Sequence, residues 1–385
     1  MLAAVTLLIA LQPVQKPLVE VDFEMSGNRI YIPTLLNGRD TPAIFDTGAG
    51  ASAVDLALAD LLKIPGEQRI QAGGVGASQV TGRILTGAKM EIGGESHPVP
   101  YAIPFASLNP AEGRPLELIL GYDFINRFVF EIDYAERKMR VHPKGTQLPN
   151  PGAAVPIKIK NGHPHIQAKV SMDGKTYDVE AMIDTGASGS GLTGKFTKTN
   201  PIPGNVKTTP VTTIGGGVGG FVTGRFLRLD SIQVGDFALK QPVVSATETA
   251  GGANGGNSAY DLLLGAEMLK RFTLTLDYAN NRVFFKPNAD IAKPFEADKT
   301  GIRLVAGGQN LRSLTITGIL PGSSADLAGL KSGDKLRSID GTYVQNKSLQ
   351  EWRDYLRDPQ KKSFDFVVER DGALVRAKVE SKPVI

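Results

Sequence analysis

The chain contains one short motif twice, an apolar run that ends in Asp-Thr-Gly-Ala. The first copy occupies residues 43–49 and the second occupies residues 181–187. Each apolar run predicts a buried strand, and each Asp-Thr-Gly predicts a tight turn that carries a carboxylate. A single Asp-Thr-Gly indicates only a turn, because Asp is common where strands end. Two copies put two carboxylates on equivalent turns, which is what hydrolysis through a shared proton requires.

Further signals follow both motifs in the same order. They are Val-Thr-Gly-Arg at 80–83 and 222–225, an apolar run ending in glycine at 118–121 and 262–265, and Asp-Tyr-Ala at 133–135 and 277–279. The offset between copies grows only from 138 residues at the aspartates to 144 at the last two pairs. Small loop insertions in a duplicated domain produce such a drift. We therefore expect two homologous halves, residues 17–150 and 151–287, arranged as a pseudo-twofold pair.

The rest of the chain predicts a linker and a third unit. The stretch from Pro287 to Lys299 has two prolines and mixed charges, so a linker is expected over 288–299. Residues 300–385 follow with strand patterns and a helical face formed by Leu349, Trp352 and Leu356. The 44 glycines and 24 prolines favour turn-rich β structure throughout.

Composition and motifs argue against several other functions. The net charge is only +4 and no long basic run is present, so nucleic-acid binding has little support. The chain has no cysteine, which excludes disulfides and cysteine catalysis. The pair His163 and His165 has neither a cysteine nor a spaced carboxylate to complete a metal site. The spaced glycines at 215–220 precede a strand pattern rather than a helix, so they do not predict a dinucleotide site. We expect no metal and no cofactor.

The N-terminus leaves two alternatives open. Residues 2–11 are apolar apart from Thr6, a run too short to span a membrane. It resembles the core of a secretory signal peptide over residues 1–16, although no Lys or Arg precedes it and no clean cleavage site follows. A periplasmic or secreted protein is the first expectation, and an ordinary apolar segment of a cytoplasmic protein is the second. No stable membrane span is expected.

The duplicated pattern over about residues 18–287 resembles retropepsin-like aspartic proteases, and residues 300–380 resemble a PDZ domain. The combination resembles bacterial aspartyl proteases that carry a C-terminal PDZ domain. It implies a mainly β fold, with two homologous lobes in one chain and a C-terminal α+β domain. Most retropepsins are single units that dimerise, so the resemblance implies a monomer with an internal pseudo-dimer. One departure is Gly50, where such motifs often have Ser or Thr, as the second copy does at Ser188.

The resemblance implies an aspartic endopeptidase in which Asp46 and Asp184 activate a water to attack a peptide bond. Thr47 and Thr185 would lock the two turns together, and Gly48 and Gly186 would allow their close approach. Ala49 and Ala187 cannot donate the hydrogen bond that a serine there could give to the carboxylates. We therefore expect higher dyad pKa values than in serine-bearing relatives, and activity at mildly acidic to neutral pH.

Two glycine-rich hairpins are expected to act as flaps over a polypeptide substrate bound as an extended strand. Their glycines are Gly73, Gly74, Gly76, Gly216, Gly217 and Gly219. In the C-terminal unit, a loop formed by Gly301, Ile302, Arg303 and Leu304 is expected to cradle the carboxylate of a peptide C-terminus. The alternative function is a catalytically inactive scaffold that binds peptides with the same fold.

Overall fold

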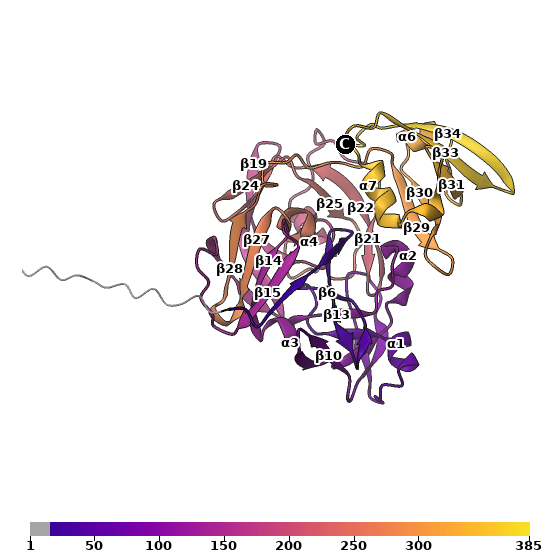
Figure 1. Ribbon diagram of the computed structural model, residues 1–385. Coiled ribbons are helices and arrows are strands. Elements are labelled where there is room, and N and C mark those ends of the chain that lie inside the picture. Colours follow the sequence, from indigo (N-terminus) through magenta and orange to yellow (C-terminus); the bar gives the residue numbers. More distant parts are fainter. Residues whose placement is uncertain (1–15) are drawn as a thin grey trace, which may run out of the picture.

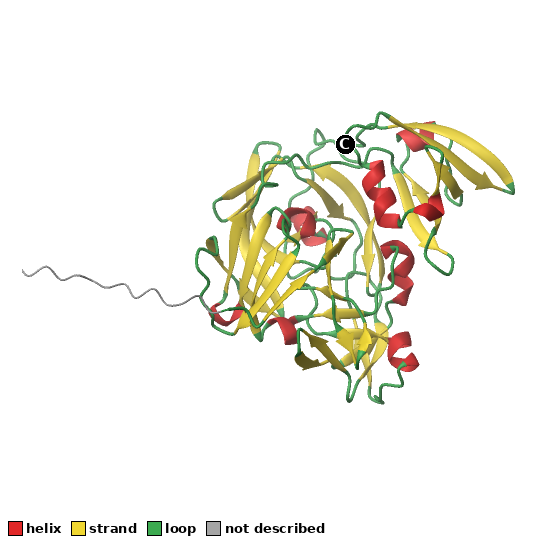
Figure 2. Cartoon of the chain, viewed as in Figure 1, coloured by secondary structure: helices red, strands yellow, loops and turns green. Residues whose placement is uncertain are grey.

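A computed structural model describes residues 16–385 of the chain (Figures 1 and 2), so the expected signal segment lies outside the described residues except for Lys16. The fold is mainly β, as the sequence predicts, with short helices at the ends of strands. We call residues 17–150 the first lobe, 151–287 the second lobe and 300–385 the C-terminal unit. No helix within residues 16–385 is both long and apolar enough to cross a membrane.

One six-stranded sheet joins the two lobes. Its order is β1 (Val19–Asp22), β15 (Lys138–Pro143), β14 (Phe128–Asp133), β27 (Phe272–Asp277), β28 (Arg282–Pro287) and β16 (Ala153–Pro156). The first three strands come from the first lobe and the last three from the second. They meet where β14 pairs antiparallel with β27, with Phe130 opposite Leu276. A single hydrophobic core runs beneath this junction and includes Phe130 and Leu274, both fully buried.

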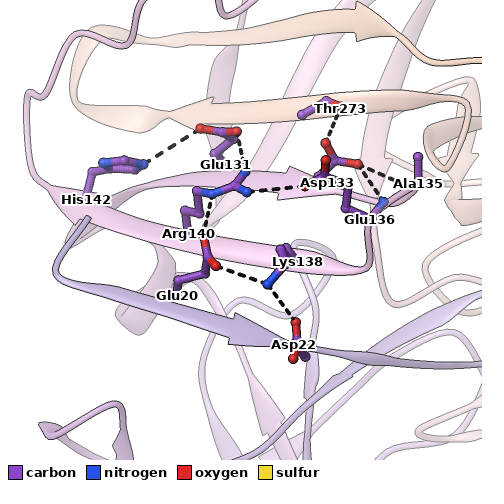
Figure 3. A network of polar contacts seen from close by, with 10 residues as sticks. All are labelled: Glu20, Asp22, Glu131, Asp133, Ala135, Glu136, Lys138, Arg140, His142 and Thr273. Atoms are coloured by element: carbon purple, nitrogen blue, oxygen red, sulfur yellow. Dashed lines mark hydrogen bonds and ion pairs between the residues drawn. The ribbon is translucent and has the colours of Figure 1, made fainter. Parts of the chain in front are cut away.

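Polar side chains reinforce one face of this junction (Figure 3). They include Glu20, Asp22, Glu131, Asp133, Lys138, Arg140, His142 and Thr273. Arg140 donates to Glu20 and to Glu131, which ties β15 to the strands on both sides. The Thr273 hydroxyl of the second lobe donates to Asp133 of the first at 3.3 Å. Such partly exposed contacts add little stability individually, but they fix the register of the shared sheet.

Each lobe also has a larger sheet that carries its Asp-Thr-Gly turn. In the first lobe the order is β2 (Glu24–Ser26), β3 (Arg29–Ile32), β6 (Ala43–Phe45), β13 (Leu118–Leu120), β7 (Ala53–Asp55), β12 (Tyr101–Ile103), β9 (Val80–Ile84) and β8 (Arg69–Ala72). In the second lobe it is β21 (Thr212–Gly217), β22 (Gly220–Arg228), β25 (Val243–Thr247), β20 (Gly191–Leu192), β26 (Leu262–Gly265), β19 (Lys175–Asp184), β18 (His163–Met172), β23 (Ser231–Val234) and β24 (Phe237–Lys240), and β17 (Lys158–Lys160) pairs with β18.

The two larger sheets share the arrangement that positions the turns. β6 lies parallel to β13, and β19 lies parallel to β26, so each motif strand runs beside the apolar strand that ends in glycine. Ser52 accepts a hydrogen bond from the Gly121 amide, and Ser190 accepts the equivalent bond from Gly265. Both serines therefore have a structural function after the turn. The repeated order in the sequence corresponds to repeated pairing in space.

The smaller elements complete the lobes. In the first lobe they are β4 (Leu35–Leu36), β5 (Arg39–Asp40), β10 (Lys89–Ile92), β11 (Glu95–Pro98), α1 (Leu56–Leu61), η1 (Ala106–Leu108), α2 (Asn109–Glu112) and α3 (Tyr122–Ile125). In the second lobe they are α4 (Gly194–Thr199), α5 (Ala266–Leu269) and η2 (Tyr278–Asn280). The sequence pattern predicts one strand over 29–36, but β3 and β4 pair in different sheets. Pro33 lies at this break and has no amide to continue a ladder.

The C-terminal unit has its own sheet and core. Its strands run in the order β29 (Ile302–Gly307), β30 (Ser313–Ile319), β31 (Lys335–Ile339), β33 (Ser363–Arg370) and β34 (Ala373–Glu380), with β32 (Thr342–Tyr343) beside β31, and its helices are α6 (Ser324–Leu327), η3 (Val344–Asn346) and α7 (Leu349–Leu356). Trp352 of α7 is fully buried in this core, and its indole donates to the Val344 carbonyl. β29 is an edge strand.

The segment between the second lobe and this unit has no strand or helix between Asn288 and Lys299, but it is anchored. Phe295 is buried, and the Arg271 guanidinium lies 3.6 Å from the centre of its ring. The same guanidinium donates to the Asp290 carbonyl at 2.9 Å. The C-terminal unit is therefore attached through a fixed segment, and it lies beside α2 and β21 in Figure 1.

Candidate active site

Asp46 and Asp184 face each other where the two motif turns meet. The Asp46 carboxylate accepts a hydrogen bond from the Gly48 amide at 2.8 Å, and Asp184 accepts from Gly186 at 2.9 Å. Each carboxyl also lies against the glycine of the opposite turn. A methyl group added at Gly48 would lie 2.5 Å from the Asp184 Cγ, and one at Gly186 would lie 2.2 Å from the Asp46 Cγ. Only glycine permits this approach, so the four residues form one compact site.

Two buried threonines hold the turns together. The Thr47 hydroxyl donates to the Ile183 carbonyl at 2.8 Å and accepts from the Thr185 amide at 3.0 Å. The Thr185 hydroxyl donates to the Phe45 carbonyl at 2.7 Å and accepts from the Thr47 amide at 3.0 Å. Thr47 is 1% exposed and Thr185 is 0% exposed. These four reciprocal bonds are shielded from water and fix the carboxyls relative to each other.

Burial changes the acidity of both carboxyls. Burial raises the pKa of Asp46 well above its usual range, and the neighbouring charge of Asp184 raises it further. Burial also raises the pKa of Asp184, although hydrogen bonds from Asp46 and from the turn amides oppose this effect. Asp184 accepts a second amide bond, from Ala187 at 2.9 Å, whereas the Ala49 amide donates to the Asp46 carbonyl. The pair is therefore suited to share one proton, with the charge favoured on Asp184.

Arg29 is a site residue that the sequence did not indicate. Its Nε donates to the carbonyl of Gly186 in the second turn, and its Nη1 donates to both carboxylate oxygens of Glu112 at 2.8 Å. Its positive charge lowers the pKa of both aspartates, although less than burial raises them. The duplication gives no signal for this residue, because the two lobes differ here. Tyr31 pairs with Ile44 as His165 pairs with Met182, so the residue equivalent to Arg29 in the second lobe is His163.

The two glycine-rich segments form hairpins that meet at their tips. β8 and β9 form the first hairpin, and β21 and β22 form the second. The Gly76 amide donates to the Val218 carbonyl at 3.0 Å, and the Ser78 amide donates to the Gly219 carbonyl at 3.1 Å. Gly219 has a φ of +89°, which favours glycine at the tip. Gly74 and Gly217 also approach the other hairpin, through Val218 and Val75. The tips thus bridge the two lobes.

This contact predicts different effects for two neighbouring glycines. A methyl group at Gly76 would lie 2.0 Å from the Gly219 carbonyl carbon, whereas a methyl group at Gly73 would contact nothing within 4 Å. We expect Gly76→Ala to separate the tips and to lower any activity that depends on closure of the hairpins by about tenfold or more, because a misplaced closing loop disturbs substrate positioning. Gly73→Ala should retain activity within about twofold, and equal losses in both variants would contradict this interpretation.

A cleft of about 1960 Å³ contains the dyad and extends to the C-terminal unit. Its walls include both aspartate turns, the inner faces of both hairpins, and side chains from β29 and α7. Within residues 16–385, no group of three or more His, Asp or Glu side chains is arranged to hold a metal ion.

The segment 301–304 is only partly the loop that the sequence predicts. Gly301 turns with a φ of +79°, but Ile302, Arg303 and Leu304 belong to strand β29. The Gly301 amide donates to Asp298 at 3.0 Å, and the Ile302 amide donates to the Thr300 hydroxyl at 3.3 Å. These amides already have partners, so the open carboxylate cradle expected from the sequence is corrected to a closed turn followed by a strand.

The free edge of β29 is covered by α2 of the first lobe (Figure 1). The Arg353 guanidinium of α7 donates to the Ala111 carbonyl at 2.8 Å. A methyl group at Gly113 would lie 2.5 Å from the Leu349 side chain of α7. The groove between β29 and α7 is therefore occupied by the chain itself. Glu112, in the same helix, is the partner of Arg29, so α2 connects the C-terminal unit to the second Asp-Thr-Gly turn.

Comparisons with known proteins agree with this architecture. Residues 32–124 and 168–268 match the family described as aspartyl protease, and together they cover about half of the chain. Residues 315–370 match the PDZ domain. DNA damage-inducible protein 1 from Chaetomium globosum is 29% identical over 134 residues, which is 34% of this chain and 28% of that protein. The chain thus matches less than a third of that relative's length.

Proposed function

The chain belongs to the aspartyl protease family, and from this premise we propose that it is an endopeptidase whose nucleophile is a water activated by Asp46 and Asp184. One observation carries the proposal: two buried carboxyls from equivalent turns lie close together, each against the glycine of the other turn. Two carboxyls this close cannot both ionise readily, so they share a proton. An isolated turn aspartate would not need such an environment.

The unequal hydrogen bonding assigns a role to each aspartate. Asp184 accepts two amide bonds and would carry the charge, so it takes a proton from the water. Asp46, with its more strongly raised pKa, would hold the shared proton and donate it toward the carbonyl oxygen of the scissile bond. The water oxygen attacks the carbonyl carbon, and a proton then passes to the leaving nitrogen as the C–N bond breaks. No covalent intermediate with the protein forms.

The surrounding elements supply positioning. The substrate would lie as an extended strand between the dyad and the two hairpins, and their joined tips would exclude water from the reacting bond. We propose that the site needs no second chain, because one chain carries both aspartates. A periplasmic or secreted location stays a prediction of the N-terminal sequence.

Cleavage of a mixed peptide library by the full chain, across pH 4 to 8, tests this function. We expect internal cleavage of peptides, with most activity at mildly acidic to neutral pH. Binding of peptides without any cleavage would instead favour the inactive scaffold. The intact dyad and the pair of buried threonines support the enzyme, since a scaffold has no need for paired buried carboxyls.

The PDZ domain is a second peptide-binding candidate, because an extended peptide could add to the edge strand β29. A peptide would first have to displace α2, which covers that edge. We expect Gly113→Ala to weaken the packing of α2 on Leu349 and to tighten binding of a C-terminal peptide by about tenfold, because the open state becomes more populated. Fluorescence anisotropy with a labelled peptide measures this affinity.

Gly322→Ala is the matched control for this variant. Gly113 and Gly322 have similar φ values of +72° and +74°, but a methyl group at Gly322 contacts nothing within 4 Å. Both alanines carry the same backbone strain, so only the Gly113 variant should gain affinity. Equal affinities in the parent and in both variants would show that α2 does not block the groove.

A further inference from the structure

We propose that the PDZ domain forms one end of the substrate cleft, where Arg303, Arg353 and Arg357 make a cationic subsite for side-chain carboxylates of the substrate. This inference deepens the proposed peptidase function and rests on it. The three arginines line the same cleft as Asp46 and Asp184. Since α2 covers the edge of β29, the charged groups that the domain brings to the cleft are mainly these side chains.

The three arginines differ from the other cations of the cleft. Arg29 is paired with Glu112, Lys270 with Glu267, and Lys293 with Asp290. Arg271 is surrounded by backbone carbonyls of the linker. Within residues 16–385, none of Arg303, Arg353 and Arg357 has an ion pair with a carboxylate.

Two arginines of the subsite are held in place without an ion pair to a carboxylate. The Arg303 guanidinium lies 5.1 Å from the centre of the Phe226 ring in the second lobe. Arg353 donates to the carbonyls of Ala111 and Leu304, at 2.8 and 3.4 Å. Arg357, which directly follows the last residue of α7, is exposed. The pKa of Arg353 is lowered to about 10, mainly by burial. The charge of Glu112 opposes this shift, and the charges of Arg357, Arg29 and Arg303 add to it. The arginines are charged at neutral pH, and they repel one another.

The acids near this end of the cleft do not balance the three charges. Glu112, Glu267 and Asp290 have the cationic partners named above, and Glu296 is paired with Lys299. Asp354 lines the cleft without a cation, and it accepts a hydrogen bond from Gln350 at 2.7 Å. Asp298 is outside the cleft lining, but its charge also acts on Arg303. Asp354 and Asp298 against three arginines still leave a net positive charge, which an acidic ligand would neutralise.

The excess charge is confined to one end. Lys160 also lines the cleft, but it is paired with Glu180, which also contacts His165. Guanidinium groups bind carboxylates through paired, charge-assisted hydrogen bonds. A peptide with Asp or Glu on the side that runs toward the PDZ domain should therefore bind more tightly than its amide analogue, whereas acidic residues on the other side should add nothing.

Four labelled peptides test the subsite. All four contain the same core sequence, which is that of the best-cleaved library peptide or, if none is cleaved, of the best-bound one. Two peptides carry four added Glu, one at the N-terminal and one at the C-terminal end, and the other two carry four added Gln at the same ends. Binding is measured by fluorescence anisotropy with the full-length Asp184→Asn variant, so affinity is separated from cleavage. We expect one Glu peptide to bind about tenfold more tightly than its Gln counterpart, and the other Glu peptide to gain less than twofold. Salt at 0.5 M should remove most of the preference.

Arg357→Gln should reduce the preference about three- to fivefold, and Arg303→Gln should act similarly. Arg312→Gln is the matched control, since Arg312 belongs to the same domain, is outside the cleft lining and lies 3.8 Å from its carboxylate partner Glu351. It should leave the preference unchanged. Four results would each overturn the subsite. They are equal affinity of the Glu and Gln peptides, an equal gain from Glu at both ends, an equal loss of preference in Arg312→Gln, and no binding of any peptide. If Glu peptides are preferred but the parent cleaves no peptide, the subsite is supported and the peptidase function is refuted. If the parent cleaves peptides but Glu peptides are not preferred, the peptidase function is supported and the subsite is refuted.

Discussion

Replacing either Asp46 or Asp184 by Asn is expected to lower kcat/KM for peptide cleavage by about 10²–10⁴-fold, the usual contribution of a positioned acid or base. Asn has nearly the same shape and can still accept the turn amide bonds, at Gly48 or Gly186. It cannot take a proton from water or hold the shared one. Kinetics with a single cleaved peptide measure the loss. Loss in only one of the two variants would refute a site built from both lobes.

The same two variants should be as stable as the parent. A loss of activity without a loss of stability would show that the substitutions remove the chemistry and leave the fold intact. The pKa of both carboxyls is raised in the folded protein, first by burial. From about pH 4 upward, toward the folded-state pKa, the folded protein therefore binds more protons than the unfolded chain, so the free energy of unfolding falls as pH rises. Asn at either position removes one titrating group and the repulsion between the two. Thermal unfolding at pH 5 and pH 7.5 should show a smaller decrease in the variants than in the parent.

Thr47→Val is expected to destabilise the protein by about 2–5 kcal/mol, because valine fills the same space without a hydroxyl. The variant leaves the Thr185 amide and the Ile183 carbonyl without partners in a buried site. Each unsatisfied group costs about 1–3 kcal/mol. Chemical denaturation measures the change, and kcat/KM should fall as well, since the bonds that fix the two carboxyls are lost.

Thr47→Ser is the control for this experiment. Serine keeps the hydroxyl and both hydrogen bonds and removes only one methyl group, which costs about 1 kcal/mol. Thr185→Val and Thr185→Ser should show the same difference in stability, because Thr185 makes the contacts that are equivalent to those of Thr47 across the pseudo-twofold axis. A serine variant as unstable as the valine variant would attribute the effect to packing rather than to the reciprocal hydrogen bonds.

Repetition explains how much of this site was predictable from the sequence. The two motifs and the matching downstream strands indicated both lobes, because a repeated order of elements folds into a repeated pairing, as β6 with β13 and β19 with β26 show. Arg29 corresponds to His163 in the second lobe, so the repeat preserved no residue type there and did not indicate Arg29. Nothing in the local sequence marked Glu112. Arg29 contacts Gly186 across the lobes, and Glu112 holds Arg29 from 83 positions away in the same lobe. Local sequence carries no information on such contacts.

The C-terminal unit shows the same limit. Its strands and its apolar helix face at Leu349, Trp352 and Leu356 were predictable from local periodicity. The docking of α2 on β29 was not, because it joins residues that lie about 200 positions apart in the chain. The loop expected at 301–304 became a closed turn for a local reason, since Asp298 and Thr300 bind its amides. Those two side chains were visible in the sequence, but their orientation was not.

The six-stranded sheet shared by the lobes has a consequence for how the protein responds to dilution. A protease assembled from two identical chains loses its site as the pair dissociates, so its specific activity depends on concentration. Here β14 and β27 belong to one chain, and each lobe meets the other at a fixed effective concentration. The covalent link also allows the two halves to differ in sequence, so that one lobe carries Arg29 while the other carries His163 at the equivalent position. Covalent fusion thus permits a two-sided cleft whose ends recognise different parts of a substrate.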